Sequence, residues 1–266
     1  MMGILGKLRT GVAVLAIIYI LIPLIVVIPA SFTSANYPSF PPEGFSFQWY
    51  TKLLERPEFI EAMVNSFQFA LLAAFFSVLF GTLGALAIAK YEIPGKAYIT
   101  ALLTAPLSVP QLVLGIALLI YFTPMMLAGT PTGFLISHII ICIPYVIRLV
   151  LTGLSGFEYN LERAAAILGA NPVTVFWRIT LPLIRPAIIS GGLFAFLTSF
   201  DNVTVSLFMV SSDMRTLPIE IFSHMQDAYN PIVASVSSVV IFISVILILI
   251  IEKIHGVGKV FGGTQT

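Results

Sequence analysis

Six runs of consecutive apolar residues dominate this sequence, and each is long enough to cross a lipid bilayer as a helix. A membrane-spanning helix needs about 20 apolar residues to cross about 30 Å of hydrocarbon. Because the apolar residues are consecutive rather than alternating, a transmembrane β-barrel is excluded. We therefore predict an all-α membrane protein, a single transmembrane domain of residues 1–266, with six spans at about 12–30, 63–89, 98–122, 133–151, 187–210 and 232–251.

The composition supports the same conclusion. Charged residues make up 9% of the chain and hydrophobic residues 58%, whereas soluble domains carry about 25% and about 45–50%. Thirteen Lys and Arg against twelve Asp and Glu give no basic excess for a nucleic-acid partner. The single cysteine, Cys142, excludes an intramolecular disulfide and multi-cysteine metal sites. Lys7 and Arg9 precede the first run, as in a signal peptide, but the run exceeds that class's usual length, so we expect a retained span.

The basic residues between the spans predict the orientation, because they are in excess on the cytoplasmic side. A cytoplasmic N-terminus places three basic residues outside, which are Lys52, Arg56 and Arg215. It places ten inside, which are Lys7, Arg9, Lys90, Lys96, Arg148, Arg163, Arg178, Arg185, Lys253 and Lys259. We therefore predict that both termini are cytoplasmic.

The longest cytoplasmic segment, between spans four and five, predicts a helical hairpin over residues 158–182. Apolar and small residues recur at helical spacing until Gly169 and Asn171-Pro172 stop the first helix. Pro172 suits the first turn of a second short helix, which we expect to end near Leu181-Pro182. The hairpin is interpreted as a docking element for a soluble cytoplasmic partner; the alternative is a pair of helices lying in the membrane interface.

The hairpin resembles the signature of the permease subunits of type I, binding-protein-dependent ABC importers. That signature is Glu-Ala-Ala, three residues, Gly, nine residues, then Ile-x-Leu-Pro. The matching residues here are Ala164, Ala165, Gly169, Ile179, Leu181 and Pro182. Arg163 occupies the position of the signature Glu, and Glu162 precedes it. The resemblance implies that residues 162–182 form the coupling helix that docks on an ATPase subunit.

The same resemblance implies a set of partners. They are two ATP-binding subunits, a homologous second permease subunit and an extracytoplasmic solute-binding protein, in the inner membrane of a bacterial cell. ATP and magnesium would bind the ATPase, with no cofactor on this chain. Residues 47–66 and Ser199-Phe200-Asp201-Asn202 look like the polyamine (spermidine or putrescine) branch. Opines, amino-acid derivatives and iron remain alternative cargoes, because permeases for them share parts of the pattern.

Polar residues inside the spans are the candidates for a solute path, since such residues are costly in lipid and tend to face the bundle interior. Asp201 is the strongest, as a carboxylate that would favour a cationic solute, with Ser199, Phe200 and Asn202 around it. His138 is a further candidate, although a hydrogen-bonded packing role leads for it. The packing alternative also holds for Asp201, and we expect Gln111 to pair a backbone group freed by a nearby proline.

Two pairs of residues in the second predicted span suggest helix contacts rather than chemistry. Asn65 and Ser66 are expected to cap or link helices, and Gly81 and Gly84 to allow close helix approach.

Enzymatic motifs are missing from the sequence. There is no G-x-x-x-x-G-K-[ST], no H-E-x-x-H and no G-x-S-x-G. We therefore predict no catalytic residue, no metal ligand and no ATP hydrolysis by this chain. A stand-alone secondary transporter is the other function considered, and it would predict inverted repeats and charge pairs in mid-membrane, neither of which the sequence contains.

Overall fold

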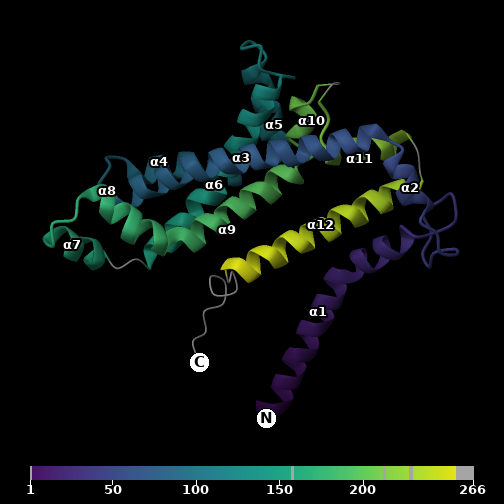
Figure 1. Cartoon of the computed structure of the whole chain (residues 1–266), viewed down its shortest axis with the longest axis horizontal. Coiled ribbons are helices and arrows are strands. Elements are labelled where there is room, and N and C mark those ends of the chain that lie inside the picture. The colour runs from purple at the N-terminus through teal and green to yellow at the C-terminus, as the bar shows by residue number, and fades with distance from the viewer. Residues whose placement is uncertain (1, 157–158, 212–213, 228–229, 256–266) are drawn as a thin grey trace. The chain divides into compact units, whose positions relative to one another are not determined.

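The computed structural model describes residues 2–156, 159–211, 214–227 and 230–255. Within these ranges the chain is helical, with one isolated β-bridge between Ser211 and Met214 and no strand. Glu158, near the start of the predicted hairpin, and Lys259, counted among the cytoplasmic basic residues, lie outside them. The described helices are drawn in Figure 1.

Four helical stretches of the described chain are long and apolar enough to span a membrane, and a bent pair would make a fifth. They are the Arg9–Ala30 part of α1 (Met2–Ala30), α3 (Pro57–Lys90), α6 (Pro131–Ser155) and the continuous stretch Pro172–Phe200. The last helix, α12 (Ile232–His255), contributes a shorter apolar stretch, Ile232–Ile246. The predicted all-helical class is therefore confirmed, together with four or five of the expected spans.

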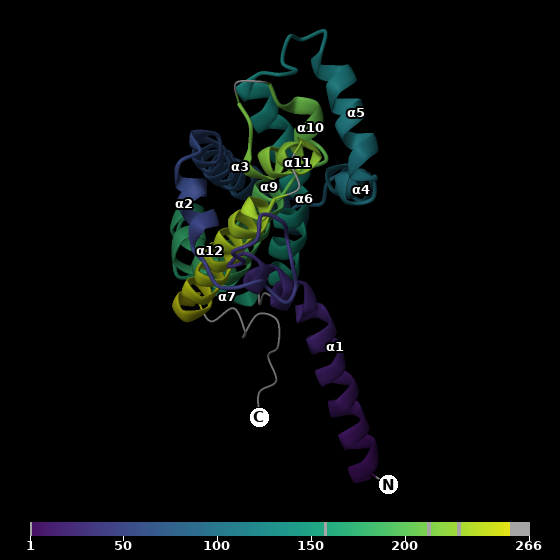
Figure 2. The same ribbon diagram turned by 90° about the vertical axis from the view of Figure 1, so that its right-hand side faces the viewer.

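The chain divides into two compact units. One contains residues 1–60 and 221–249, and the other residues 61–220 and 250–266. The core of the second unit is formed where α3 and α9 (Leu181–Phe200) pack against α6. The three helices lie side by side in Figures 1 and 2. Cys142, Val146 and Val150 of α6 are fully buried there.

Both α3 and α9 approach α6 closely at Val146. A Cβ on Gly81 of α3 would lie 2.8 Å from the Val146 Cβ, and one on Gly191 of α9 would lie 3.2 Å from the Val146 Cα. A Cβ on Gly84 would meet only the Ile147 Cδ1, at 3.8 Å. The expected close approach is thus confirmed at Gly81, while Gly84 makes an ordinary contact.

The third predicted span is broken rather than continuous. Its first half is α4 (Lys96–Thr104) with a short 3-10 turn, Ala105–Leu107, and its second half is α5 (Gln111–Phe122). The helix direction changes by 103° between the two halves. Pro106 and Pro110 flank the break, where each removes a backbone N–H from the helical ladder. The expected single helix over 98–122 is therefore wrong, because two prolines fall in one turn.

The start of the fifth span also differs from the prediction. The short helix α8 (Pro172–Val175) runs through a π-helical turn, Phe176–Thr180, directly into α9, and does not end at Leu181-Pro182. The N–H of Leu181 bonds to the carbonyl of Phe176, five residues back. This wide turn lets the helix continue past Pro182, whose ring would otherwise meet the carbonyl of the preceding turn.

The first unit contains a folded loop between α1 and α2 (Gln48–Leu54). The Trp49 indole N–H donates to the Thr33 carbonyl at 3.0 Å, and the hydroxyls of Ser31 and Tyr50 lie 2.7 Å apart. The ring of Phe32 stacks on Phe45 at 5.0 Å. Trp49 is thus buried, and its indole N–H fixes the loop to the start of α2.

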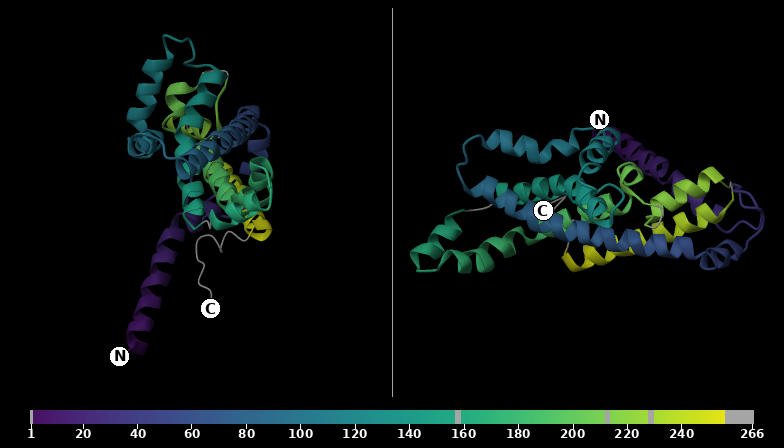
Figure 3. Two further views of the ribbon diagram at one scale, coloured as in Figure 1. Left: turned by 90° about the vertical axis from the view of Figure 1, so that its left-hand side faces the viewer. Right: turned by 90° about the horizontal axis from the view of Figure 1, so that it is seen from above.

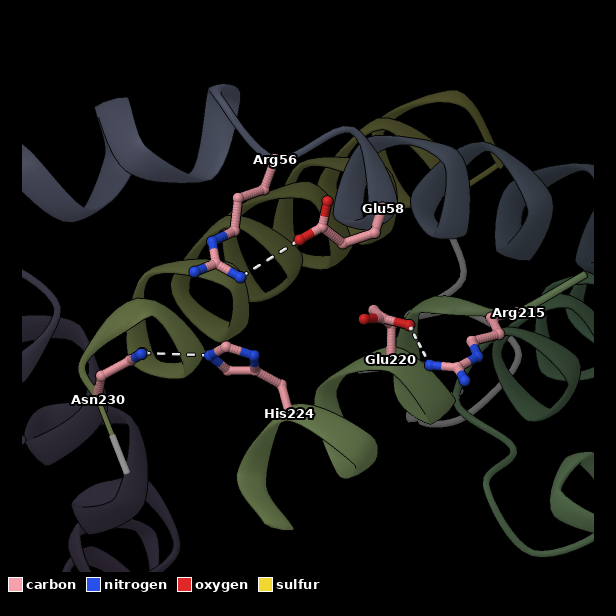
Figure 4. A network of polar contacts seen from close by, with 6 residues as sticks. All are labelled: Arg56, Glu58, Arg215, Glu220, His224 and Asn230. Atoms are coloured by element: carbon pink, nitrogen blue, oxygen red, sulfur yellow. Dashed lines mark hydrogen bonds and ion pairs between the residues drawn. The ribbon is translucent and has the colours of Figure 1, made fainter. Parts of the chain in front are cut away.

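The start of α11 (Leu217–Asp227) is held by the second predicted span. The Ser66 Oγ accepts the Leu217 N–H at 2.7 Å, and the Asn65 amide donates to the Arg215 carbonyl at 3.1 Å. The expected helix-linking role of Asn65 and Ser66 is therefore confirmed. Arg215 in turn forms an ion pair with Glu220 in the first turn of α11 (3.2 Å; Figure 4).

Candidate functional site

The helix of the predicted fifth span, α9, ends at Phe200, among the residues predicted to line the solute path. The Oδ1 of Asn202 accepts the N–H groups of Val205 at 2.9 Å and of Ser206 at 3.4 Å, and α10 (Ser206–Met209) begins there. This is the N-capping arrangement, in which a short polar side chain replaces the helical ladder. The expectation of one helix over 187–210 is therefore wrong at this point, because α9 ends at Phe200 and the side chain of Asn202 bonds to the backbone of the turn that leads into α10.

His138 of α6 joins the two sides of this break. Its Nδ1 lies 2.7 Å from the Ser199 Oγ and its Nε2 lies 3.0 Å from the Ser206 Oγ. The Ser206 hydroxyl also approaches the Asn202 carbonyl at 2.6 Å and can only donate to it, so it accepts from His138. The proton of this neutral imidazole is thus assigned to Nε2, and Ser199 donates to Nδ1. His138 is 1% exposed and stacks on Phe134, which favours the packing role.

Gln111, the first residue of α5, connects this break to the broken third span. Its Oε1 accepts from the Asn202 Nδ2 at 3.2 Å. The expectation that Gln111 pairs a backbone group near Pro110 is corrected, since its partner is a side chain 91 residues away. Figure 2 shows α5 and α10 next to each other, and α10 packs on both α5 and α6. The two helix breaks therefore meet at one polar contact.

The residues predicted for the solute path fall into two groups. Ser199, Phe200, Asn202 and His138 are buried and hold the break together, whereas Asp201 is exposed. Asp201 is the first residue after α9, and its N–H closes the last helical turn on the Leu197 carbonyl. The break thus presents one carboxylate on a scaffold of buried hydroxyl, amide and imidazole groups.

The predicted cytoplasmic hairpin is present as α7 (Tyr159–Ile167), a tight turn and α8. Gly169 has a φ of +86°, which favours glycine, and the N–H groups of Gly169 and Ala170 bond back to Ala166 and Ala165. The Asn171 Oδ1 then accepts the Thr174 N–H at 2.8 Å and caps α8. Figure 3 shows the hairpin at one end of the second unit.

The tip of the hairpin carries an exposed apolar face. Leu168 is 88% exposed and Ile167 85%, and on α8 and the π-helical turn Val173 and Trp177 are exposed as well. Arg163 and Ala164 are also exposed, while Ala165, Ile179 and Leu181 are partly buried. We name this apolar face the hairpin face, and it consists of Ile167, Leu168, Val173 and Trp177.

Glu162, unlike its exposed neighbours Arg163 and Ala164, is partly buried and bonds to other helices. Its carboxylate is within 2.6 Å of the Lys90 Nζ at the end of α3, and the Thr180 hydroxyl donates to the same oxygen. Sequence reasoning missed Lys90 and Thr180 as members of the site. No local signal could have found them, because Lys90 lies 72 residues before Glu162.

Metal-binding groups do not emerge from the described part of the chain. No three or more His, Cys, Asp or Glu side chains come together there in a way that could hold an ion. The sulfur of Cys142 instead donates to the Ala195 carbonyl at 3.2 Å, inside the α6–α9 contact.

Comparison with known proteins identifies the family of this chain. The family model "Binding-protein-dependent transport system inner membrane component" matches residues 77–255. The spermidine/putrescine transport system permease protein PotC of Escherichia coli (strain K12) is 32% identical over 249 residues, covering 92% of this chain and 93% of that protein. The putrescine transport system permease protein PotI of the same organism is 30% identical over 240 residues, covering 88% of this chain and 85% of that protein.

The fold has solved counterparts. One is a chain in the crystal structure of a bacterial alginate ABC transporter in complex with an alginate pentasaccharide-bound periplasmic protein, with a TM-score of 0.72 and 17% identity, covering 98% of this chain and 96% of that chain. At this identity the likeness concerns the fold alone. Together with the family match, it shows that this chain belongs to the binding-protein-dependent transport system inner membrane components and is a permease subunit of an ABC importer, whose ATPase is a separate subunit.

Proposed function

We propose that this chain is one of two homologous permease subunits that together enclose a solute path through the inner membrane of a bacterial cell. It would cross the membrane six times with both termini in the cytoplasm. The four apolar spanning stretches, the bent pair α4–α5 and the apolar helix α12 support this number. The basic residues Arg163 and Arg178 of the hairpin, with Arg185 just after it, support a cytoplasmic position for the hairpin.

The hairpin face is the observation that carries the proposal. An apolar surface at the tip of a water-exposed hairpin is costly unless another protein covers it. Two ATPase subunits would each take one hairpin of the permease pair, and ATP and magnesium would bind only to them. Closure of the ATPases on ATP would pull both hairpins and open the path to the outside, where a solute-binding protein delivers its cargo; hydrolysis would reset the path.

Leu168→Asp tests the docking. The substitution places a charge at the centre of the hairpin face, where the contact would have to desolvate it. We expect the ATPase subunit to be lost from the purified complex, while the permease itself stays folded. Leu54→Asp is the matched control, because Leu54 is also exposed (72%) but lies at the end of α2. Retention of the ATPase by Leu168→Asp would refute the docking surface.

The cargo is proposed to be a polyamine or a similar cation. PotC and PotI are named for spermidine and putrescine, and the exposed carboxylate of Asp201 at the helix break suits a cationic solute. In a region of low dielectric, one carboxylate favours a cation strongly over a neutral solute. The buried Ser199, Asn202 and His138 would then keep Asp201 in place.

Asp201→Asn tests the cargo, with spermidine delivered by the binding protein to the complete transporter in proteoliposomes. We expect slower uptake at saturating binding protein, and partial recovery with Asp201→Glu, which keeps the charge. Glu43→Gln is the matched control, since Glu43 is in the loop after α1. Unchanged uptake by Asp201→Asn would refute the role of the carboxylate. Uptake of an opine, an amino-acid derivative or iron in place of spermidine would refute the cargo.

A further inference from the structure

Lys90, Glu162 and Thr180 form a compact polar cluster at the base of the hairpin. The Lys90 Nζ lies 2.6 Å from the Glu162 Oε1 and 3.4 Å from the Thr180 Oγ1. The Thr180 hydroxyl donates to that same Glu162 oxygen. The side chains of Lys90 and Glu162 are 24% and 17% exposed, and Thr180 is buried. The three side chains therefore supply one another's hydrogen-bond partners at a site largely removed from water.

Each member of the cluster belongs to a different part of the fold. Lys90 is the last residue of α3, Glu162 is in the first turn of α7, and Thr180 closes the π-helical turn before α9. Both charges stand at the helix end that favours them, because a helix C-terminus attracts a cation and an N-terminus an anion. The ion pair therefore connects the end of α3 directly to the start of α7. The bond from Thr180 to Glu162 connects both to the start of α9.

Thr180 lies where the helical ladder is weakest. The π-helical turn Phe176–Thr180 widens the chain, and Pro182 follows two residues later without an N–H to donate. Such turns inside helices are frequent at functional sites and at bends. A displacement of α7 would thus reach α9 at a point that can bend.

We infer that Lys90 is a positioning residue for energy coupling, and that it holds Glu162 so that movement of α7 is passed to the cytoplasmic ends of α3 and α9. The inference rests on the proposed function, because it assumes that an ATPase moves the hairpin. Glu162 would then act in transmitting movement rather than in docking the ATPase. The ATPase would contact the hairpin face, and the Lys90–Glu162–Thr180 cluster would transmit the movement within the permease.

The test compares transport with hydrolysis in the complete transporter. Lys90→Met keeps an unbranched side chain that is one atom shorter and removes its charge. We expect the spermidine imported per ATP hydrolysed to fall about fivefold or more, while the ATPase still co-purifies with the permease. Lys90→Arg should restore a large part of the ratio, and the exchange Lys90→Glu with Glu162→Lys a smaller part, because it places each charge at the helix end that disfavours it. The matched control is Lys96→Met, because Lys96 is an exposed lysine at the start of α4.

A second measurement does not depend on the cargo. Hydrogen exchange with and without ATP should show a nucleotide-dependent change at α7 and at the end of α3 in the wild type. In Lys90→Met the change should persist at α7 and disappear at α3.

Three results would overturn the inference. They are an unchanged ratio of spermidine imported to ATP hydrolysed in Lys90→Met, an equal fall of that ratio in Lys96→Met, or loss of the ATPase from the Lys90→Met complex. The last would mean that Lys90 serves docking. Failure of the proposed function itself would show separately, as ATPase binding that survives Leu168→Asp.

Discussion

Gly81→Ala should destabilise the permease because the added methyl group has no space. The new Cβ would lie 2.8 Å from the Val146 Cβ and 2.9 Å from its Cγ1. Val146 cannot move aside, since it is fully buried and has Gly191 of α9 against its other flank. A β-branched side chain in a helix also has essentially one χ1 rotamer. The helices α3 and α6 would have to separate by several tenths of an ångström.

The magnitude follows from two opposing effects. Overpacking a close-packed site costs about 1–3 kcal/mol, whereas replacing glycine by alanine in a helix interior gains about 0.5–1 kcal/mol. We expect a net loss of about 1–2 kcal/mol in the free energy of unfolding for Gly81→Ala. Gly84→Ala is the matched control, three residues along the same helix. Its Cβ would meet only the Ile147 Cδ1 at 3.8 Å, so it should stabilise by up to about 1 kcal/mol.

The assay is reversible unfolding of the purified permease in mixed micelles of increasing SDS content, followed by tryptophan fluorescence. A double-mutant cycle with Val146→Ala sharpens it. In the Gly81→Ala background, Val146→Ala makes room for the new methyl group, so its cost should be smaller by about 1 kcal/mol. Equal shifts for the two glycine variants, or a strictly additive cycle, would refute the close approach of α3 and α6 at Val146.

Three further outcomes are expected. Ser66→Ala should cost about 1 kcal/mol of unfolding free energy and speed amide exchange at Leu217, whose N–H loses its acceptor. His138→Leu should lower the free energy of unfolding more than His138→Gln, by about 1–3 kcal/mol, because leucine removes the imidazole partner of two buried hydroxyls, those of Ser199 and Ser206. Equal unfolding curves would argue against the link. The pKa of Tyr37 is raised above 10 by the hydrogen bond to Glu43. The hydrogen bond from Tyr37 to Glu43 therefore contributes fully to stability below pH 10, the unfolded pKa of tyrosine, and this contribution is lost as the pH rises through the folded pKa. Phenolate absorbance of wild type minus Tyr37→Phe should show the late titration.

Much of the architecture follows from local sequence patterns. The apolar runs predict the spanning helices, Gly169 and Asn171 predict the turn of the hairpin, and Ser66 was expected to link helices. Each of these depends on the chemistry of a few neighbouring residues. A left-handed turn needs glycine, and a helix start needs an oxygen acceptor, so both can be found without a structure.

The differences arise where distant residues or helix continuity decide the outcome. The hairpin was expected to end at Pro182, but a π-helical turn carries the chain past it, and such a turn leaves no periodic pattern. The polarity of Asn202 predicts a place in the solute path, whereas its bond to the Val205 N–H, in the turn before α10, depends on the helix break, which polarity alone does not predict. The Lys90–Glu162 pair depends on how α3 and α7 are brought together, which no spacing in the sequence encodes.

The burial of Cys142 has a practical consequence for experiments on this permease. It is the single cysteine of the sequence, it is fully buried, and its sulfur is engaged with the Ala195 carbonyl. The wild-type chain can therefore serve as its own labelling background, without a cysteine-free variant. A cysteine introduced at an exposed position such as Leu168 or Asp201 would react with a polar maleimide while the native thiol stays unmodified. Probes for distance measurements can thus be attached without altering the α6–α9 contact around Cys142.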